Sequence, residues 1–185
     1  MALVHVIGID PGLAGGVARV DVVDGIPTSA TILGRTPALW VTKRNGIRRR
    51  EYDVHAMVHL LRDAVGDKYH AIVALEQGGP RPSQGLASTY RTGMGVGLWH
   101  GLIAALGCSL VLIHPSVWKR VVGLIGAEKR ASRLKAVERF PGLGVLGPAD
   151  EGGAEAVLIA LAAVAVLETA GRQLRGVRPP NGAGG

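Results

Sequence analysis

Acidic side chains stand beside apolar segments of this chain in places that exposure to solvent does not explain. One follows the first apolar run, one ends a central apolar run, and three open the most apolar segment of all. They are Asp10, Glu76, Asp150, Glu151 and Glu155. A carboxylate near a core needs a partner or a metal ion, because an unpaired buried charge is costly. These five acids are therefore the first candidates for a functional site.

Carboxylates that meet at one point cannot all remain ionised without a cation, and their hard oxygen atoms select Mg²⁺ or Mn²⁺. In a helix, Glu151 and Glu155 would lie about 40° apart, whereas Asp150 and Glu155 would lie about 140° apart. Glu151 and Glu155 are therefore the better pair. Two divalent ions about 4 Å apart can activate water and stabilise the leaving oxygen in phosphodiester hydrolysis. We therefore expect a metal-dependent hydrolytic site with two ions.

The same acids also have structural interpretations. Asp150 after Pro148 is a natural helix N-cap, and Glu151 in a first turn is favoured by the helix dipole. The Asp10-Pro11-Gly12 stretch could be only a turn. Glu76 is harder to explain in this way, because it closes an apolar strand.

Basic side chains form two groups that could flank the acids and bind phosphates. The first group surrounds Asn45-Gly46, at a predicted loop or hairpin tip. It consists of Lys43, Arg44, Arg48, Arg49 and Arg50. The second group follows the strand expected over 109–113. It consists of Lys119, Arg120, Lys129, Arg130, Arg133 and Lys135. Either group alone could be a solvated segment, and nearby Trp40 could stack on a base or lie in the core.

The composition limits the classes of protein to consider. The chain has 185 residues, enough for one domain with a tail, and 21 Lys and Arg against 14 Asp and Glu give a net charge of +7. This balance favours a polyanionic partner, nucleic acid first. The single Cys108 excludes an intrachain disulfide and fits a reducing compartment, and His55 with His59 lacks a visible third zinc ligand. With no secretory signal and no apolar run of membrane length, we expect a cytoplasmic protein without membrane contact.

Hydrophobic patterning predicts an α/β domain with a mixed sheet covered on both faces. The expected strands are 3–9, 15–23, 28–33, 70–76 and 109–113. The Asp24-Gly25 pair is a good hairpin turn between the second and third strands. The runs 3–9 and 70–76 each lead to an acid, and neighbouring strands would bring Asp10 and Glu76 to one edge of the sheet.

The expected helices alternate with the later strands. They cover 54–65, 89–106, 127–140 and 150–170. Asp53 can cap the first, and Gly66 can end it. The second carries Gly93, Gly97 and Gly101 on one face, which predicts close packing against a strand or a partner subunit. Residues 171–185 are rich in Arg, Gly and Pro and are predicted to be a disordered tail after a domain over 1–170.

Four short motifs, in this order and spacing, resemble the RuvC family of Holliday junction resolvases, especially its phage-like branch. They are Ile7-Gly8-Ile9-Asp10-Pro11-Gly12, Ala74-Leu75-Glu76-Gln77, His114-Pro115-Ser116-Val117-Trp118-Lys119 and Ala154-Glu155-Ala156-Val157-Leu158-Ile159-Ala160. The resemblance spans roughly residues 4–168. It implies a ribonuclease H-like fold with a mixed five-stranded sheet, a homodimer in the cytoplasm of a bacterial or phage-infected cell, and paired Mg²⁺-dependent nicks on four-way DNA junctions.

The resemblance also implies roles for individual residues. Asp10, Glu76 and Glu155 look like metal ligands, and Lys119 resembles a basic residue near the scissile phosphate. The family usually has another acid three or four residues before Glu155, where this chain has Gly152 and Glu151. Asp150 could substitute if the helix starts late, so the fourth ligand stays open.

Three alternatives remain from the sequence. The chain could be another ribonuclease H-like nuclease acting on RNA/DNA hybrid or on branched DNA. It could also be a scaffold that binds nucleic acid without metal chemistry. An actin-like ATPase shares an Asp-x-Gly turn, but it needs a second lobe for which 185 residues leave no room, so we expect no nucleotide cofactor.

Overall fold

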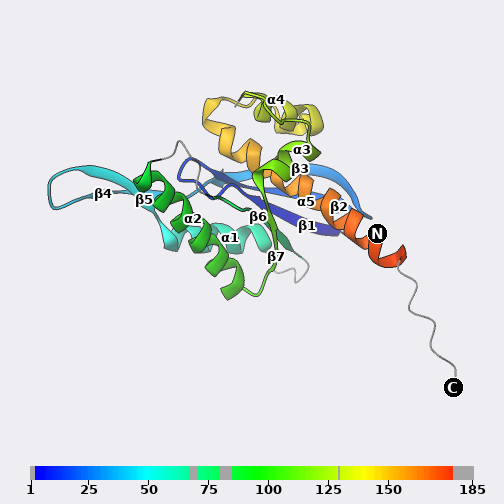
Figure 1. Cartoon of the computed structure of the whole chain (residues 1–185), viewed down its shortest axis with the longest axis horizontal. Helices are drawn as coiled ribbons and strands as arrows, with labels where there is room; N and C mark the ends of the chain where they lie inside the picture. The colour runs from blue at the N-terminus through cyan, green and yellow to red at the C-terminus, as the bar shows by residue number, and fades with distance from the viewer. Residues whose placement is uncertain (1–2, 67–70, 80–84, 129, 177–185) are drawn as a thin grey trace, which may run out of the picture.

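A mixed five-stranded sheet forms the centre of the molecule. The computed structural model describes residues 3–66, 71–79, 85–128 and 130–176 (Figure 1). The strands of the central sheet are β1 (Leu3–Ile9), β2 (Gly16–Val23), β3 (Ile26–Arg35), β6 (Ile72–Glu76) and β7 (Ser109–Ile113). Their order is β3-β2-β1-β6-β7. β1 runs antiparallel to β2 and parallel to β6, which in turn runs parallel to β7. The predicted mixed sheet of five strands is confirmed.

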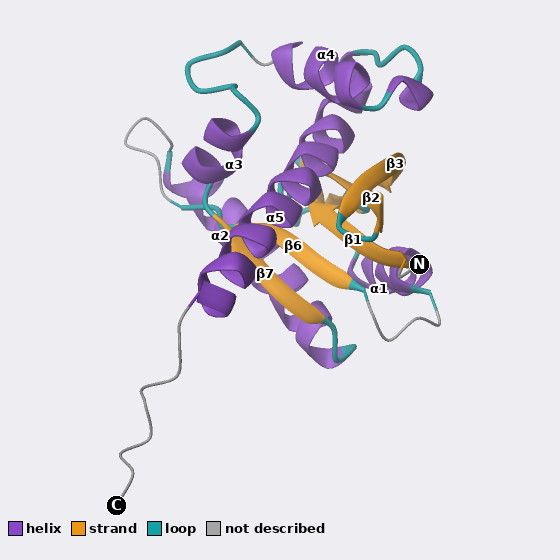
Figure 2. Cartoon of the chain, turned by 90° about the vertical axis from the view of Figure 1, so that its right-hand side faces the viewer, coloured by secondary structure: helices purple, strands orange, loops and turns teal. Residues whose placement is uncertain are grey.

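Helices cover both faces of this sheet. They are α1 (Val54–Val65), α2 (Leu86–Ala105), α3 (Pro115–Val121), α4 (Arg130–Arg139) and α5 (Glu151–Gly176). The long helix α5 crosses one face, against β1, β2 and β3, while α1 and α2 lie on the other face (Figure 2). α4 lies beyond the end of the sheet, next to the start of α5 (Figure 2). Helix α5 continues to Gly176, six residues into the predicted tail, and the remaining residues 177–185 lie outside the described ones.

The alternation of side chains along the strands divides the core in two. In β1, Val6 packs toward α5, whereas Ile7 and Ile9 pack toward α1 and α2. In β6, Ala74 takes the α5 side and Leu75 the opposite side. Successive side chains of a strand point to opposite faces. Glu76, two residues after Ala74, therefore points to the α5 side.

Local signals at the first helix and the first turn are confirmed. The Asp53 carboxylate accepts a hydrogen bond from the Ala56 N–H at 3.0 Å, which caps α1. Gly66 ends α1 with φ 63°, a left-handed conformation that favours glycine. Asp24 and Gly25 both have positive φ, at 49° and 85°, as a tight hairpin turn between β2 and β3 requires.

Helix α5 approaches the sheet so closely that backbone touches backbone. A Cβ at Gly8 would overlap the carbonyl oxygen of Ala156. A Cβ at Gly152 would come within 2.5 Å of the carbonyl oxygen of Ala14, and Gly15 and Gly152 form a parallel β-bridge. Glycine is therefore required at these contacts for steric reasons, and the contacts fix the first turn of α5 against the end of β1.

The glycines of α2 behave differently. Gly93, Gly97 and Gly101 are exposed, and a Cβ at any of them would meet no atom of the described residues within 4 Å. Within the part of the chain that the structure describes, the prediction that this strip packs closely against a strand is wrong. The contact that α2 does make through a glycine is at Gly95, which packs against Tyr52.

Two strands were not predicted. β4 (Ala38–Thr42) and β5 (Arg48–Tyr52) pair antiparallel as a separate hairpin that projects from the body of the molecule (Figure 1). Its tip is the Asn45-Gly46 pair, with Gly46 at φ 76°, so the predicted hairpin tip is confirmed. The missed strands carry a run of arginines whose like charges hide the alternation expected of a strand.

Helix α5 is also the most apolar element. By length and composition alone, Pro148–Gly171 would suffice to cross a membrane, but 56% of its most apolar window is buried in the molecule. That burial is against the sheet, where Val157, Leu158 and Ile159 are fully buried. It therefore serves as the core helix expected from the sequence.

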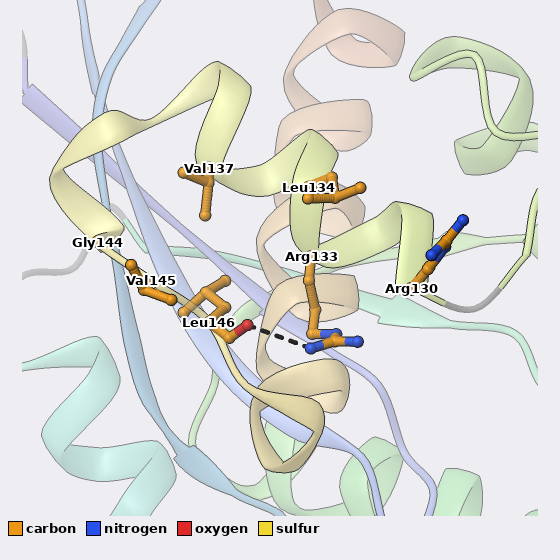
Figure 3. A pocket seen from close by; sticks show the side chains of 7 residues that line it. All are labelled: Arg130, Arg133, Leu134, Val137, Gly144, Val145 and Leu146. Carbon is orange, nitrogen blue, oxygen red and sulfur yellow. Dashed lines mark hydrogen bonds between the residues drawn. The ribbon is translucent and has the colours of Figure 1, made fainter.

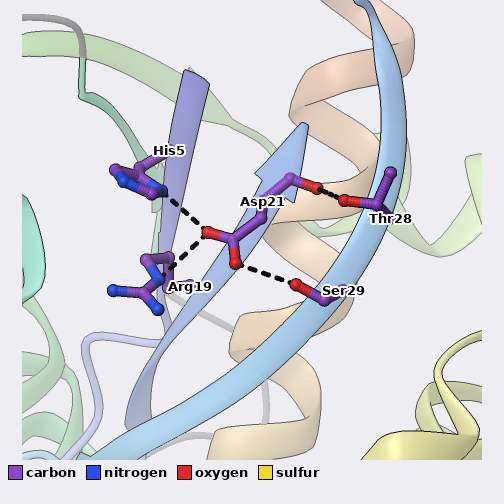
Figure 4. Close-up of polar contacts among 5 residues, drawn as sticks. All are labelled: His5, Arg19, Asp21, Thr28 and Ser29. Atoms are coloured by element: carbon purple, nitrogen blue, oxygen red, sulfur yellow. Dashed lines mark hydrogen bonds and ion pairs between the residues drawn. The ribbon is translucent and has the colours of Figure 1, made fainter. Parts of the chain in front are cut away.

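A polar cluster links the three neighbouring strands β1, β2 and β3 (Figure 4). The Asp21 carboxylate on β2 pairs with His5 on β1 at 2.7 Å and with Arg19 at 3.1 Å, and it accepts a hydrogen bond from Ser29 on β3 at 2.8 Å. Partial burial opposes ionisation of Asp21, but the bonds from Ser29 and His5 and the charge of Arg19 outweigh it and lower its pKa.

Candidate active site

The pairing of β1 with β6 brings the first two candidate acids together. Ile9 lies opposite Leu75 in the parallel register, so Asp10 and Glu76 are the next residues along two adjacent strands. Adjacent strands are about 4.8 Å apart. The Asp10 N–H donates to the Gly16 carbonyl at 3.0 Å, which extends the β1–β2 pairing by one residue. The sequence prediction that these two acids meet at one edge is confirmed.

The start of α5 adds the next two acids. Glu76, Glu151 and Glu155 line one pocket of about 140 Å³. Glu151 and Glu155 are one helical turn apart and both face this pocket, as their spacing predicted. Asp10 is not in the lining of this pocket as it stands. A Cβ at Gly15 would come within 2.8 Å of the Asp10 carboxyl carbon, however, and Gly15 is bridged to Gly152 in the same turn of α5.

The pocket is strongly acidic. Glu128, between α3 and α4, is a fourth carboxylate in its lining, and among the described lining residues Lys119 carries the one ammonium group. Glu128 also pairs with Arg130 at 3.1 Å on the surface. Four carboxylates around so small a space repel one another, and a bound cation would relieve that repulsion.

Trp118 holds the deepest of these acids. Glu76 is only 9% exposed, and its Oε2 accepts a hydrogen bond of 2.6 Å from the indole N–H of Trp118, which is fully buried on α3. Hydrogen bonds to the charged form stabilise a buried carboxylate. One oxygen of Glu76 is thereby engaged and the side chain is fixed in the pocket. No local sequence pattern predicts this contact, because the two residues are 42 positions apart.

Two further side chains complete the wall of the pocket. The hydroxyl of Ser132 on α4 donates to Glu155 Oε1 at 3.4 Å, a long bond that links α4 to α5. The ammonium nitrogen of Lys119 lies 5.3 Å from the centre of the Trp118 ring, within the range of a cation–π contact. Lys119 is the next residue after Trp118, which binds Glu76. Among the described lining residues, Lys119 supplies the positive charge of the pocket.

The geometry separates the candidates for the fourth acid. The carboxylate of Asp150 accepts a hydrogen bond from the Gly147 N–H at 2.8 Å, so it closes the short 3-10 turn Pro148–Asp150 and does not line the pocket. Gly152 is buried against the backbone of Ala14 and Gly15, where no side chain fits. The acid before Glu155 that does line the pocket is Glu151.

The donor set matches a hard divalent cation, because every candidate ligand is a carboxylate oxygen. In the described parts of the chain, no three Asp, Glu, His or Cys side chains already stand close enough to hold a metal ion. Mutual repulsion of like charges favours such a spread arrangement before a cation binds. The pair His55 and His59 lies exposed on α1 and belongs to no such group in those parts.

Tyr52 links the loop after Asp10 to the opposite layer of helices. Its hydroxyl lies 3.2 Å from the carbonyl oxygen of Pro11 and 3.1 Å from that of Arg91, so it can donate to either. Burial, together with the charge of Asp10, raises the pKa of Tyr52 to about 12. The phenol therefore remains a neutral donor at physiological pH, and it ties the end of β5 to the Asp10 loop.

The predicted phosphate-binding side chains fall on two surfaces. Lys43, Arg44, Arg48, Arg49 and Arg50 lie on the β4–β5 hairpin. Lys119 and Arg120 lie at the end of α3, and Arg130, Arg133 and Lys135 lie on α4. Lys129 lies outside the described residues. On the hairpin, Arg48 stacks over Trp40 at 5.3 Å from the ring centre, and Trp40 is 60% exposed, so it is not a core residue.

Arg133 has a structural contact. Its guanidinium donates to the Leu146 carbonyl at 3.2 Å and so holds the segment after α4 against that helix (Figure 3). The same segment and α4 enclose an apolar pocket of about 380 Å³ whose lining includes Leu134, Val137 and Val145 (Figure 3). Lys135 is paired with Glu138 at 2.9 Å. On α4, Arg130 is the more exposed of the two described arginines that the sequence singled out.

The order β3-β2-β1-β6-β7, with helices on both faces, defines a ribonuclease H-like domain. Among solved structures, the Thermus thermophilus RuvC structure is similar, with a TM-score of 0.58 at 19% identity over 89% of this chain and 96% of that chain. The structure of T. thermophilus RuvC in complex with Holliday junction substrate gives a TM-score of 0.56 at 18% identity, with the same coverages. At such identities the likeness shows the fold. No protein-family model and no curated protein sequence matches the chain.

Proposed function

We propose that this protein is a structure-selective DNA endonuclease that resolves four-way junctions, similar to the phage-like branch of RuvC. The observation that supports the proposal best is the pocket lined by Glu76, Glu151 and Glu155. Asp10 stands beside Glu76, at the end of the adjacent strand. RuvC, whose fold this chain shares, has been solved with Holliday junction substrate. The net charge of +7 suits the same class of substrate.

In this proposal the carboxylates bind the metal ions, and the ions provide the hydrolytic chemistry. Asp10, Glu76, Glu151 and Glu155 would hold two Mg²⁺ or Mn²⁺ ions, which when bound would activate a water and stabilise the leaving oxygen. Glu151 is the fourth ligand, because Gly152 has no space for a side chain and Asp150 is engaged by Gly147. Glu76, Glu151 and Glu155 line the pocket, and Asp10 stands beside Glu76 on the adjacent strand.

The basic residues position the DNA. Lys119 neutralises the scissile phosphate, while the hairpin cations and those of α3 and α4 hold the backbone of the junction arms. Replacing Lys119 by alanine should therefore reduce cleavage more than junction binding. Cleavage depends on this contact with the scissile phosphate, whereas binding is shared among many phosphate contacts.

A cleavage assay tests the function directly. Synthetic four-way junctions, linear duplex and an RNA/DNA hybrid are incubated with Mg²⁺ or Mn²⁺ and the native chain or the variant Asp10→Asn. We expect nicks at symmetric positions on the junction alone, and their loss in Asp10→Asn with binding retained. Preferred cutting of the hybrid would indicate another ribonuclease H-like nuclease. Binding without nicking, unchanged in Asp10→Asn, would indicate a scaffold.

Paired nicks require two sites related by two-fold symmetry, so the proposal includes a homodimer. The exposed Gly93, Gly97 and Gly101 strip on α2 offers a surface on which a second copy could pack closely, since no atom within the described chain covers it. Sedimentation of the native chain and of Gly97→Arg, which places a bulky charge on the strip, tests this part. If the native chain is a monomer, the proposed homodimer is wrong. If it is a dimer that Gly97→Arg does not disrupt, the interface does not include the glycine strip.

A further inference from the structure

A second groove, on the side of α1 and α2, is not explained by the hydrolytic site. It has about 380 Å³ of space between the β4–β5 hairpin and the start of α2. Its lining includes Arg49 and Arg50 of β5 and Tyr90 and Arg91 of α2. Leu13, three residues after Asp10, also lines it. In Figure 1 the start of α2 lies beside β5. The groove therefore joins a projecting basic hairpin to the loop that follows the first candidate ligand.

The charge of the groove is complementary to a phosphate. Among the described lining residues, Lys43, Arg49, Arg50 and Arg91 contribute four positive charges and Glu51 the one carboxylate. Glu51 pairs with Lys43, so the three arginines set the net charge. Guanidinium groups present a planar set of donors that suits phosphate oxygens.

The rest of the lining is apolar and aromatic. Tyr90 is 71% exposed and Leu86 is 91% exposed, and both line the groove together with Met94. An exposed ring beside arginines is the arrangement that stacks a base while its phosphate is held, and it is tolerant of sequence. In a Watson–Crick duplex the base faces are stacked on one another, so such a site suits an unpaired nucleotide.

The groove is also mechanically joined to the candidate active site. Tyr52, at the end of β5, can donate to the carbonyl of Arg91 on one side and to that of Pro11, next to Asp10, on the other. Gly95 on α2 packs directly against the Tyr52 hydroxyl and Pro11. The position of the groove relative to Asp10 is therefore fixed by buried contacts.

From these observations we infer that the groove binds an unpaired nucleotide at the branch point of the DNA. The base stacks on Tyr90 beside Leu86, and the phosphate is held by Arg49, Arg50 and Arg91. This inference rests on the proposed function, because it assigns branch-point recognition to a surface outside the acidic pocket. It explains how a basic protein would distinguish a junction, where bases can be unstacked, from continuous duplex.

The test compares Tyr90→Ala with the matched variant Tyr90→Phe, which keeps the ring. All proteins carry Asp10→Asn so that binding is measured without cutting. The ligands are a four-way junction, a single-stranded oligothymidine and a blunt duplex, at several salt concentrations. Leu134→Ala, which removes an exposed apolar side chain of α4 outside the groove, is the control for general loss of apolar surface. Thermal unfolding of each variant shows that folding is retained.

We expect Tyr90→Ala to weaken binding of the junction and the single strand about tenfold, while Tyr90→Phe, Leu134→Ala and duplex binding stay unchanged. The salt slope should be unchanged in Tyr90→Ala but about 0.7 smaller for single strands in Arg49→Ala, which loses a phosphate contact. Native affinity in Tyr90→Ala, an equal loss for duplex, or a change only in self-association would each overturn the inference.

The two proposals fail in different ways. If the chain with its native Asp10 cuts four-way junctions but Tyr90→Ala binds them normally, only the nucleotide groove is wrong. If the native chain cuts no junction but single-strand affinity still depends on the ring at position 90, the resolvase proposal is wrong and the groove remains.

Discussion

Two buried tryptophans differ in one hydrogen bond, and that bond gives one of them a role in positioning a candidate metal ligand. Trp99 and Trp118 are both fully buried. The indole N–H of Trp99 has no hydrogen-bond partner in the described structure, whereas that of Trp118 donates to Glu76. Both rings contribute apolar packing, but only Trp118 also fixes the orientation of a candidate metal ligand.

Replacing each tryptophan by phenylalanine tests this difference. Trp118→Phe keeps an aromatic ring and removes the donor, so Glu76 loses its orientation, and we expect Mn²⁺ affinity to fall about tenfold, as is typical when a partner of a metal ligand is removed. Trp99→Phe makes the same change in ring size without touching Glu76 and should leave Mn²⁺ affinity unchanged. Calorimetric titration without DNA measures both, and equal effects in the two variants would contradict the positioning role of Trp118.

The site could be predicted from the sequence only as far as local patterns reach. Asp10 and Glu76 were found because each ends an apolar strand, and Glu151 with Glu155 because of their helical spacing. Trp118 and Tyr52 were missed, since their roles depend on contacts across 42 and 41 positions that no local pattern encodes. The helical spacing already favoured Glu151 over Asp150, and the structure adds the reason that Asp150 is engaged elsewhere, in its hydrogen bond to Gly147.

At the scale of elements, the contact between α5 and the sheet decides where the acids stand. The strands and helices with clear periodicity were predicted nearly at their observed bounds. The β4–β5 hairpin was not predicted as strands, because its charged run shows no alternation, although Asn45-Gly46 marked its tip. The glycine spacing also led to a wrong prediction. The strip on α2 is exposed, and the close approach of a helix to the sheet is that of α5, at Gly8 and Gly152. Composition does not tell which glycine faces a neighbour.

Gly152→Ala tests the close approach of α5. Its Cβ would meet backbone atoms of Ala14 and Gly15 at 2.5 Å, and these cannot move aside as a side-chain end could. We expect the free energy of unfolding to fall by about 1–3 kcal/mol, the usual cost of overpacking. Gly142→Ala, at an exposed glycine with nothing within 4 Å of its Cβ, is the control and should change stability by less than about 1 kcal/mol. Urea denaturation would show the difference, and equal stabilities would mean that α5 lies farther from β2.

At the scale of the whole molecule, the predicted phosphate-binding cations lie on the β4–β5 hairpin and on α3 and α4. The acidic pocket lies where the end of β6 meets α3, α4 and the start of α5. The Asp21 cluster includes none of these residues. It joins β1, β2 and β3, so it contributes to the stability of the entire fold.

The Asp21 cluster predicts how the free energy of unfolding decreases in acid. Because the folded pKa of Asp21 is lowered below 3.8, its contribution is present above pH 3.8 and is lost as the pH falls through the folded pKa. We expect Asp21→Asn to lower the unfolding free energy by about 1 kcal/mol near neutral pH, since the group is partly exposed, and to match the native chain in strong acid. Urea denaturation from pH 7 to pH 2 measures this difference. A gap that stays constant down to pH 2 would contradict the role given to the ionised carboxylate.

The position of α5 in the chain also affects how the protein is made. The strands β1, β2 and β3 are synthesised first, yet the helix that shields one of their faces begins only at Glu151. Until the ribosome has released that helix, a broad apolar surface stays open to other chains. Domains usually fold as units during translation, and uncovered sheets of this kind aggregate. A nascent chain of this protein should therefore depend on chaperones until its C-terminal portion emerges.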